Sequence, residues 1–223
     1  MSEFTHGTLS PWGYTYDAEV LPDLISPVDF ANFTNGKFGT TDTRINANIS
    51  SASASIRNYC GWHVSPSLVC GMVYNVYDLR DAFVGPDLLI QLPSTFVTEV
   101  TKVVLNAVWN ADTESWDGDT ITADRIDNGT AGLVKVYDVG HLDRRSKVFV
   151  KYKAGFNETA IPILKELAAN GVIHALTNSY GVNSEAAGGV SVTYNTSWVA
   201  KGSTALANDT REALEAYRVK GVF

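Results

Sequence analysis

Three side chains near the end of the first long apolar pattern could together do chemistry: Cys60, His63 and Cys70. A thiol and an imidazole three positions apart could form a nucleophile and its base, or two thiols and an imidazole could ligate zinc. Structural zinc normally takes four ligands, and the fourth would have to come from the distant His141 or His174. We therefore expect Cys60 to be a small buried residue at a helix end and His63 to be hydrogen-bonded locally. We predict no catalytic residue, no metal and no cofactor.

Acidic residues crowd around Trp116, at Asp112, Glu114, Asp117 and Asp119. Carboxylates at this density could hold calcium, but an EF-hand loop needs oxygen ligands at fixed positions and a closing glutamate, and the spacing does not fit. We expect a solvated hairpin loop, with contact to a neighbouring protein as the alternative.

Basic residues form one cluster, made of Arg144, Arg145, Lys147, Lys151 and Lys153. Such a cluster could touch DNA phosphates or an acidic neighbour, or it could be an exposed strand edge whose charge discourages unwanted pairing. The whole chain carries a net charge of −7 and has a pI of about 5.0. This balance argues against a protein that grips phosphates and suits a surface that DNA passes without sticking.

The remaining sequence has no signature of an enzyme. There is no phosphate-loop pattern, no G-x-S-x-G and no H-E-x-x-H. With 223 residues, 45% of them hydrophobic, the chain can bury one or two cores. It has no apolar run of about 18 residues, so we expect no membrane contact. We also expect no signal peptide and, with two cysteines, no disulfide framework.

The elements that must position these residues begin with a long helix over 42–60. Gly61 can end it, and Thr41 or Asp42 can cap its start. Its Ala and Ser residues keep the other faces thin, so that a neighbouring helix or subunit can approach closely. Its apolar residues fall on one helix face, and we expect these and the following tryptophan to pack within the core or between subunits: Ile45, Ile49, Ala52, Ile56, Tyr59 and Trp62.

The period changes after Pro86, where five segments read as strands: 88–92, 97–105, 120–126, 133–137 and 147–152. The helical period returns over 157–180, a short strand follows at 190–194, and a last helix runs from Ser203 or Thr204 to near Gly221. A short helix before the long one begins at Ser26-Pro27 and ends at Asn35-Gly36. Short links between the five strands, with turn signals such as Trp116-Asp-Gly118, indicate antiparallel hairpins.

The predicted fold class is therefore α+β, a small helical bundle built on two long helices, with an inserted antiparallel β module and a C-terminal helix. We predict three parts: an N-terminal arm over 1–24 that orders on contact, a helical connector core over 25–85 and 156–223, and the β module over 86–155.

A helix rich in Ala and Ser that runs into Ile56-Arg-x-Tyr-Cys-Gly-Trp-His-Val-x-Pro66 resembles the head-to-tail adaptor (head–tail connector) proteins of long-tailed bacteriophages. The likeness continues through Val148-x-Val-x-Tyr-x-Ala-Gly-Phe156, Ser184-Glu185 and Leu214-x-x-Tyr217-Arg218. It spans about residues 26–219, while 1–24 and 69–85 depart from the family pattern.

The resemblance implies a non-enzymatic virion protein of the head–tail junction, assembled in the host cytoplasm. Copies would form a ring, usually twelvefold, that docks on the portal protein and extends the DNA channel. DNA would pass without sequence-specific binding, and the ring would offer a platform for the next neck or tail-completion protein. The C-terminal segment of this family tends to reach the portal, so the expected portal contacts are Leu214, Tyr217, Arg218 and Phe223.

Two other functions stay open. A β-rich virion binding or decoration module could recognise a glycan or another protein through aromatics such as Trp109 and Trp116. A small hydrolase could use Cys60 as its nucleophile.

Overall fold

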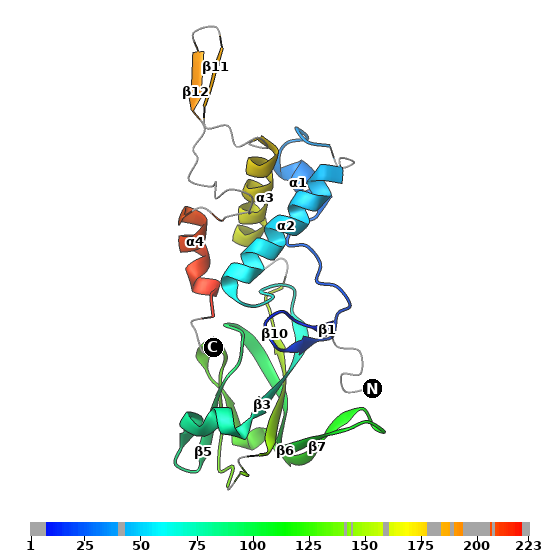
Figure 1. The fold of residues 1–223 in the computed structure, drawn as a ribbon, viewed down its shortest axis with the longest axis vertical. Helices are drawn as coiled ribbons and strands as arrows, with labels where there is room; N and C mark the ends of the chain where they lie inside the picture. The colour runs from blue at the N-terminus through cyan, green and yellow to red at the C-terminus, as the bar shows by residue number, and fades with distance from the viewer. Residues whose placement is uncertain are drawn as a thin grey trace. The chain divides into compact units, whose positions relative to one another are not determined.

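The computed structural model contains two compact units (Figure 1). The β unit comprises Met1–Leu21, Gly61–Asn157 and Val219–Phe223, and the helical unit comprises Pro22–Cys60 and Glu158–Arg218. The structure describes residues 8–39, 43–140, 142–143, 145–157, 161–177, 184–187, 190–193, 206 and 208–219.

The helical unit begins with α1 (Pro27–Phe33), which forms where the local signals predict it. Ser26 has extended backbone angles, and its hydroxyl accepts the Asp29 N–H at 3.0 Å. Proline occupies the first turn, where its missing N–H costs nothing. After the helix, Gly36 takes a positive φ of 73° and donates its N–H to the Ala31 carbonyl at 2.8 Å. The predicted start and stop are both confirmed.

The long helix α2 (Thr43–Cys60) also matches its prediction. Its apolar stripe is buried, and Gly61 follows it with a positive φ of 77°, the conformation that glycine adopts at little cost at a helix end. The predicted capping residues Thr41 and Asp42 lie outside the described residues. The buried members of the stripe are Ile45, Ile49, Ala52, Ile56 and Cys60.

The second long helix, α3 (Pro162–Thr177), runs through Gly171 without a break and packs against α2. A short hairpin, β11 (Ser184–Ala187) with β12 (Val190–Thr193), follows, so the predicted strand at 190–194 is present. The last helix begins at Asn208 as α4 (Asn208–Leu214) and ends in the 3-10 turn η5 (Glu215–Tyr217), before the predicted end near Gly221. Its predicted start at Ser203 or Thr204 lies outside the described residues.

The β unit holds two antiparallel sheets. The larger has six strands in the order β1-β2-β3-β10-β6-β7, and the smaller has four in the order β4-β5-β9-β8. The 3-10 turns η1 (Val76–Ala82), η2 (Ala123–Arg125) and η3 (Thr130–Gly132) link strands. The strands are β1 (Thr8–Leu9), β2 (Thr15–Tyr16), β3 (Leu68–Asn75), β4 (Phe83–Val84), β5 (Asp87–Gln91), β6 (Val97–Asn110), β7 (Ser115–Ile121), β8 (Ile126–Asn128), β9 (Leu133–Val136) and β10 (Lys147–Ala154).

One predicted strand, 120–126, is wrong. Trp116-Asp-Gly118 reads as a turn in the sequence but lies inside β7, and the chain turns earlier, at 111–114. Gly118 does not form a turn but lets the backbones of β6 and β7 approach closely. A Cβ at this position would collide with the Leu105 carbonyl, where the pairing of the two strands is irregular between Leu105 and Val108. Glycine inside a strand often marks such a bulge.

The segments 1–24 and 68–75 also contribute more than their patterns indicate. β1 and β2 add two short strands to the sheet through β3, and Tyr14 and Tyr16 are buried. β3 itself pairs with β10 along eight residues. These pairings join residues far apart in sequence, so local periodicity does not reveal them.

The α+β class is confirmed, with the helices in one unit and both larger sheets in the other. The strand β10 differs from its predicted pattern in one respect. Phe149, on the same face as Lys147 and Lys151, is only 1% exposed because it stacks on Trp116, with ring centroids 5.5 Å apart.

Replacing Gly171 with alanine should stabilise the protein. A Cβ at this position would meet the Ala52 Cβ at 3.6 Å, an ordinary van der Waals contact. Alanine is favoured over glycine inside a helix, so we expect the free energy of unfolding to rise by about 0.5–1 kcal/mol in urea denaturation.

The matched control is Gly155→Ala, at a residue with a φ of 107° whose Cβ would collide with the Pro66 carbonyl. It should destabilise the protein by about 1–3 kcal/mol. A loss of stability in Gly171→Ala would show that α2 and α3 leave no room for the methyl group.

Candidate functional site

Of the three side chains considered for chemistry, Cys60 lies in the helical unit, and His63 and Cys70 lie in the β unit. Cys60 closes α2 and is buried, and burial, followed by the charge of Glu215, raises the pKa of its thiol to about 12. Cys70 lies on β3, where burial raises its pKa further. Both shifts favour the neutral thiol over the thiolate, which is the nucleophilic form of cysteine. Among the described residues, no group of three histidines, cysteines or acids is placed to hold a metal.

His63 is held by a buried network inside the β unit. Its Nδ1 lies 2.7 Å from the Tyr14 hydroxyl, and its Nε2 lies 3.1 Å from the Ala154 carbonyl. A carbonyl only accepts, so Nε2 carries the proton and Nδ1 accepts from Tyr14. The Tyr14 oxygen also accepts the His63 backbone N–H at 3.0 Å. The partners are distant in sequence, so the expected local bonding of His63 is wrong.

Tyr14→Phe tests this network. The substitution keeps the aromatic ring but removes the donor to Nδ1 and the acceptor for the backbone N–H of a fully buried residue. Loss of a buried partner costs about 1–3 kcal/mol, and we expect a fall of that size in the free energy of unfolding, measured in urea.

Tyr16→Phe is the control, because the Tyr16 hydroxyl makes no hydrogen bond among the described residues. It should change stability by less than about 0.5 kcal/mol. Equal losses in the two variants would mean that the His63 network contributes nothing specific.

The acidic run lies on the β6–β7 hairpin, as predicted, and is hydrogen-bonded within it. Asp117 accepts from Asn110 at 2.6 Å and from Ser115 at 3.0 Å, and these bonds lower its pKa. Asp119 accepts from Asn106 at 2.9 Å. Asp112 in the turn and Asp117 and Asp119 on the strand are exposed, whereas Glu114 is half-buried.

The two tryptophans proposed for ligand recognition lie against each other on this hairpin. Trp109 and Trp116 form an edge-to-face pair with centroids 5.4 Å apart, and Trp116 also stacks on Phe149. Trp116 therefore packs against the sheet, whereas Trp109 is 40% exposed.

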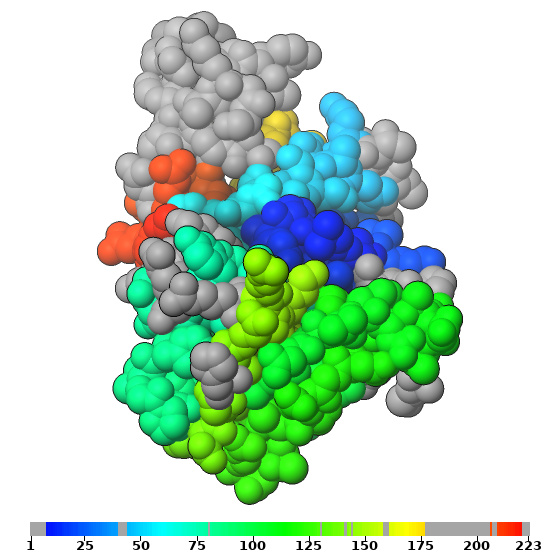
Figure 2. Space-filling view, turned by 60° about the horizontal axis from the view of Figure 1, so that its bottom comes forward, coloured from blue at the N-terminus to red at the C-terminus, as the bar shows by residue number. Residues whose placement is uncertain are grey.

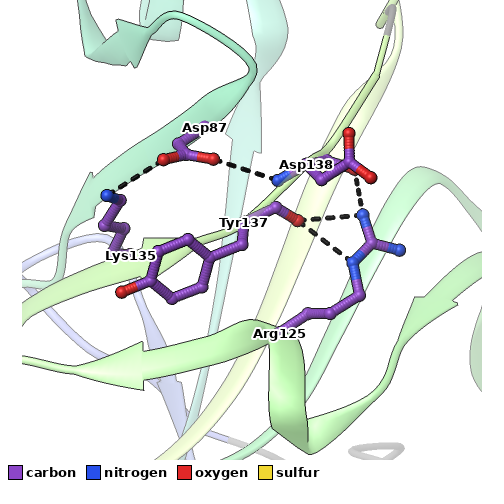
Figure 3. Close-up of polar contacts among 5 residues, drawn as sticks. All are labelled: Asp87, Arg125, Lys135, Tyr137 and Asp138. Carbon is purple, nitrogen blue, oxygen red and sulfur yellow. Dashed lines mark hydrogen bonds and ion pairs between the residues drawn. The ribbon is translucent and has the colours of Figure 1, made fainter.

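A second polar network lies on the smaller sheet (Figure 3). Asp87 on β5 pairs with Lys135 on β9 at 2.9 Å and accepts the Asp138 N–H at 3.1 Å. Lys135 also lies over the Tyr137 ring, 4.5 Å from its centroid. Arg125 donates to the Tyr137 carbonyl at 2.9 Å and to the Asp138 carbonyl, which ties η2 to the end of β9. Sequence reasoning did not identify this network.

The Asp87 network should make stability depend on acidic pH. The hydrogen bond from Lys135, then that from Asp138, lowers the pKa of Asp87 below its usual 3.8. Its contribution is therefore complete above the unfolded-state pKa and is lost as the pH falls through the folded-state value. We expect Asp87→Asn to be destabilised at pH 7 and to lose less stability than the wild type between pH 5 and pH 2.

Thermal unfolding across that pH range measures the effect. Asp124→Asn, at an exposed carboxylate in η2 of the same unit, is the control. If Asp87→Asn and the wild type lost stability in parallel, the pairing seen in Figure 3 would not stabilise the fold.

Comparison with known proteins identifies the family of this chain. A family model described as "Head completion protein" matches residues 23–219. The chain belongs to the head completion protein family. The suspected relationship to head–tail junction proteins is thereby confirmed, and this is a structural, non-enzymatic family of the virion neck.

The fold has a counterpart among solved structures. A chain of "Neck of native GTA particle computed with C12 symmetry" matches 92% of this chain and 97% of its own length. The TM-score is 0.50 and the sequence identity is 18%, so the likeness is one of fold. No curated protein matches the sequence. No helix in the described part of the chain is long and apolar enough to span a membrane.

In this head completion protein, the residues predicted for helix packing lie on the inner side of α2 and just beyond it. Ile45, Ile49, Ala52 and Ile56 are buried, and so is Trp62 in the β unit. Tyr59 is half-buried, and its hydroxyl donates to Glu215 at 2.6 Å.

Polar residues of α2 bind residues 22–24, the segment that precedes α1, and the sequence analysis did not predict these contacts. Ser53 accepts the Leu24 N–H at 2.9 Å, and the buried Arg57 donates to the Pro22 carbonyl at 2.6 Å. Ser50 donates to Asp23 at 2.9 Å. One feature of the sequence could have indicated these contacts. Ser53 and Arg57 each directly follow a buried residue of the stripe, so they lie beside the buried face of the helix.

The predicted portal residues separate into two kinds. Leu214 is fully buried, so its side chain anchors the last helix and is not available at the surface. Tyr217 is half-buried and Arg218 is exposed. Arg218 pairs with Glu215 at 3.2 Å and lies 5.4 Å from the Tyr59 ring centroid. Phe223 lies outside the described residues.

Proposed function

We propose that this protein forms a ring of identical subunits, twelve in number, that docks on the portal protein at the virion neck. The ring extends the DNA channel without sequence-specific binding and offers a platform to the next neck or tail-completion protein. The observation that carries the proposal is the family match over 23–219, supported by a fold shared with a chain from a neck computed with C12 symmetry.

The two parts of the chain have different proposed roles in the ring. The connector core, predicted over 25–85 and 156–223, forms the ring, and the β module, predicted over 86–155, projects outward or widens the contact between subunits. Because β3 lies within the first range but pairs with β10, we assign the connector role to the helical unit itself.

One surface of α2 suits contact between subunits. Ala47, Ser50, Ala54 and Asn58 are exposed at helical spacing, opposite the buried stripe. Short side chains let a second helix approach closely, and a ring needs such a contact to repeat from each subunit to the next. We propose this outer face, and not the buried stripe, as the helix contact between copies.

The C-terminal segment is the proposed portal contact. Tyr217, Arg218 and Phe223 remain its candidates, while the buried Leu214 holds the helix that presents them. An aromatic and a cation beside one another are typical of residues that dominate the energy of protein interfaces.

The experiment is to mix the purified protein with portal protein of the same virus and to image the mixture by electron microscopy. We expect an added ring layer, coaxial with the portal, with twelve subunits. Tyr217→Ser combined with Arg218→Glu should abolish the layer, whereas Arg211→Glu, an exposed control on α4, should retain it.

The outcomes separate the two parts of the proposal. No ring layer from folded wild-type protein would contradict the ring function. A ring layer formed equally by the double variant would leave the ring function standing and contradict the C-terminal contact.

A further inference from the structure

The last helix, which presents the proposed portal residues, packs against α2 within the helical unit. Figure 2 shows the orange-red residues of α4 next to the cyan end of α2. Leu214 is fully buried there, and Thr210 is 2% exposed. A helix of seven residues is too short to be stable alone, so α4 and the turn η5 depend on this packing for their position.

Arg218, the cation of the proposed portal contact, has two partners within its own chain. Its Nη1 lies 3.2 Å from Oε1 of Glu215, and its guanidinium carbon lies 5.4 Å from the centroid of the Tyr59 ring. The same Glu215 oxygen accepts the Tyr59 hydroxyl at 2.6 Å. We name these three side chains the Arg218 cluster.

The two polar contacts of the Arg218 cluster differ in strength. A short hydrogen bond to a carboxylate is stronger than one between neutral groups, and this bond is the main reason that the pKa of Tyr59 lies above its usual value. The ion pair is weaker, because the side chains of Arg218 and Glu215 are 50% and 44% exposed and exposed ion pairs stabilise a fold only slightly. Arg218 can therefore leave at little cost, while Tyr59 continues to bind Glu215.

We propose that Arg218 exchanges partners when the subunit docks, leaving Glu215 for a carboxylate on the portal protein. This inference rests on the proposed portal contact. While Glu215 neutralises Arg218, an approaching carboxylate would be repelled by Glu215 as well as attracted by the guanidinium. The attraction is complete only after Arg218 turns away from Glu215. Glu215 is thus an internal competitor of the portal.

The contacts that Arg218 gives up indicate the chemistry of the site that receives it. A competing site must replace an ion pair, and the planar guanidinium binds a carboxylate most strongly through two parallel N–H bonds. In the subunit Arg218 reaches Glu215 through Nη1, at an exposed position. A carboxylate that binds both arms of the guanidinium in a buried interface therefore outcompetes Glu215.

Binding of the subunit to immobilised portal protein of the same virus measures this competition. Glu215→Gln removes the competing charge and keeps the shape of the side chain. We expect half-maximal binding at about a fivefold lower subunit concentration than for the wild type, which is the most that an exposed ion pair provides. Glu212→Gln is the matched control, because it removes one negative charge from an exposed position of the same helix, and it should bind as the wild type does.

A double-mutant cycle tests whether the gain depends on Arg218. Arg218→Gln should bind about tenfold more weakly than the wild type, and adding Glu215→Gln to it should recover no more than about twofold. Tyr59→Phe is a second route to the same effect if Glu215→Gln does not fold. It removes the hydroxyl that orients Glu215 and keeps the ring, and it should tighten binding about twofold.

The salt dependence of binding tests the acidic character of the receiving site. Salt screens the attraction between charges, so raising its concentration should weaken binding of the wild type more than binding of Arg218→Gln. Equal salt dependence in the two proteins would show that Arg218 does not meet an acidic group.

The remaining outcomes overturn the inference in distinguishable ways. If Glu215→Gln binds as the wild type does, or more weakly, Glu215 does not compete with the portal, and the exchange is wrong while the portal contact stands. If the fivefold gain persists in the Arg218→Gln background, the gain does not depend on Arg218. If the folded wild type does not bind portal protein at all, the proposed function fails and the exchange fails with it.

Discussion

The helical unit depends on α2, which buries an apolar stripe of isoleucines and also makes buried hydrogen bonds through Ser53 and Arg57. Ile45, Ile49 and Ile56 are almost fully buried, and burial of one such side chain stabilises a fold by about 1.5–3 kcal/mol. The hydrogen bond that Ser53 accepts from the Leu24 N–H contributes about 1 kcal/mol. The stripe therefore supplies most of the stability. The polar contacts decide position, because the buried Arg57 must be hydrogen-bonded and the Pro22 carbonyl is one of its acceptors. In this way α2 fixes both where α3 packs and how the chain enters α1.

The sequence predicted what local chemistry controls. Ser26 and Pro27 define the start of α1, the spacing of isoleucines defines α2, and alternation defines much of β5, β9 and β10. It did not predict what depends on distant partners. β3 forms because β10 pairs with it, and Tyr14 is buried because His63, forty-nine positions away, bonds to it. Gly118 was misread for the same reason, since the atom it must avoid is the Leu105 carbonyl on another strand. Among the site residues, the stripe on α2 was found, whereas the burial of Leu214 could not be read from a C-terminal amphipathic pattern.

One small residue lets an aromatic ring pack closely against the larger sheet. A Cβ on Gly71 would lie 3.1 Å from the Phe149 ring, so glycine lets the aromatic ring lie close over β3. Phe149 in turn supports Trp116, and Trp116 supports Trp109. The hairpin is thus supported from the centre of the sheet outward by a series of aromatic contacts.

The outermost strands of the two larger sheets limit how copies of this protein can associate. Three of the four outermost strands in the two larger sheets, β1, β4 and β8, are only two or three residues long, too short to template another chain. The fourth, β7, is seven residues long but carries Asp117 and Asp119 in its middle. Adding a further copy strand to strand would bring these carboxylates together. The described edge strands therefore disfavour open-ended pairing of copies strand to strand.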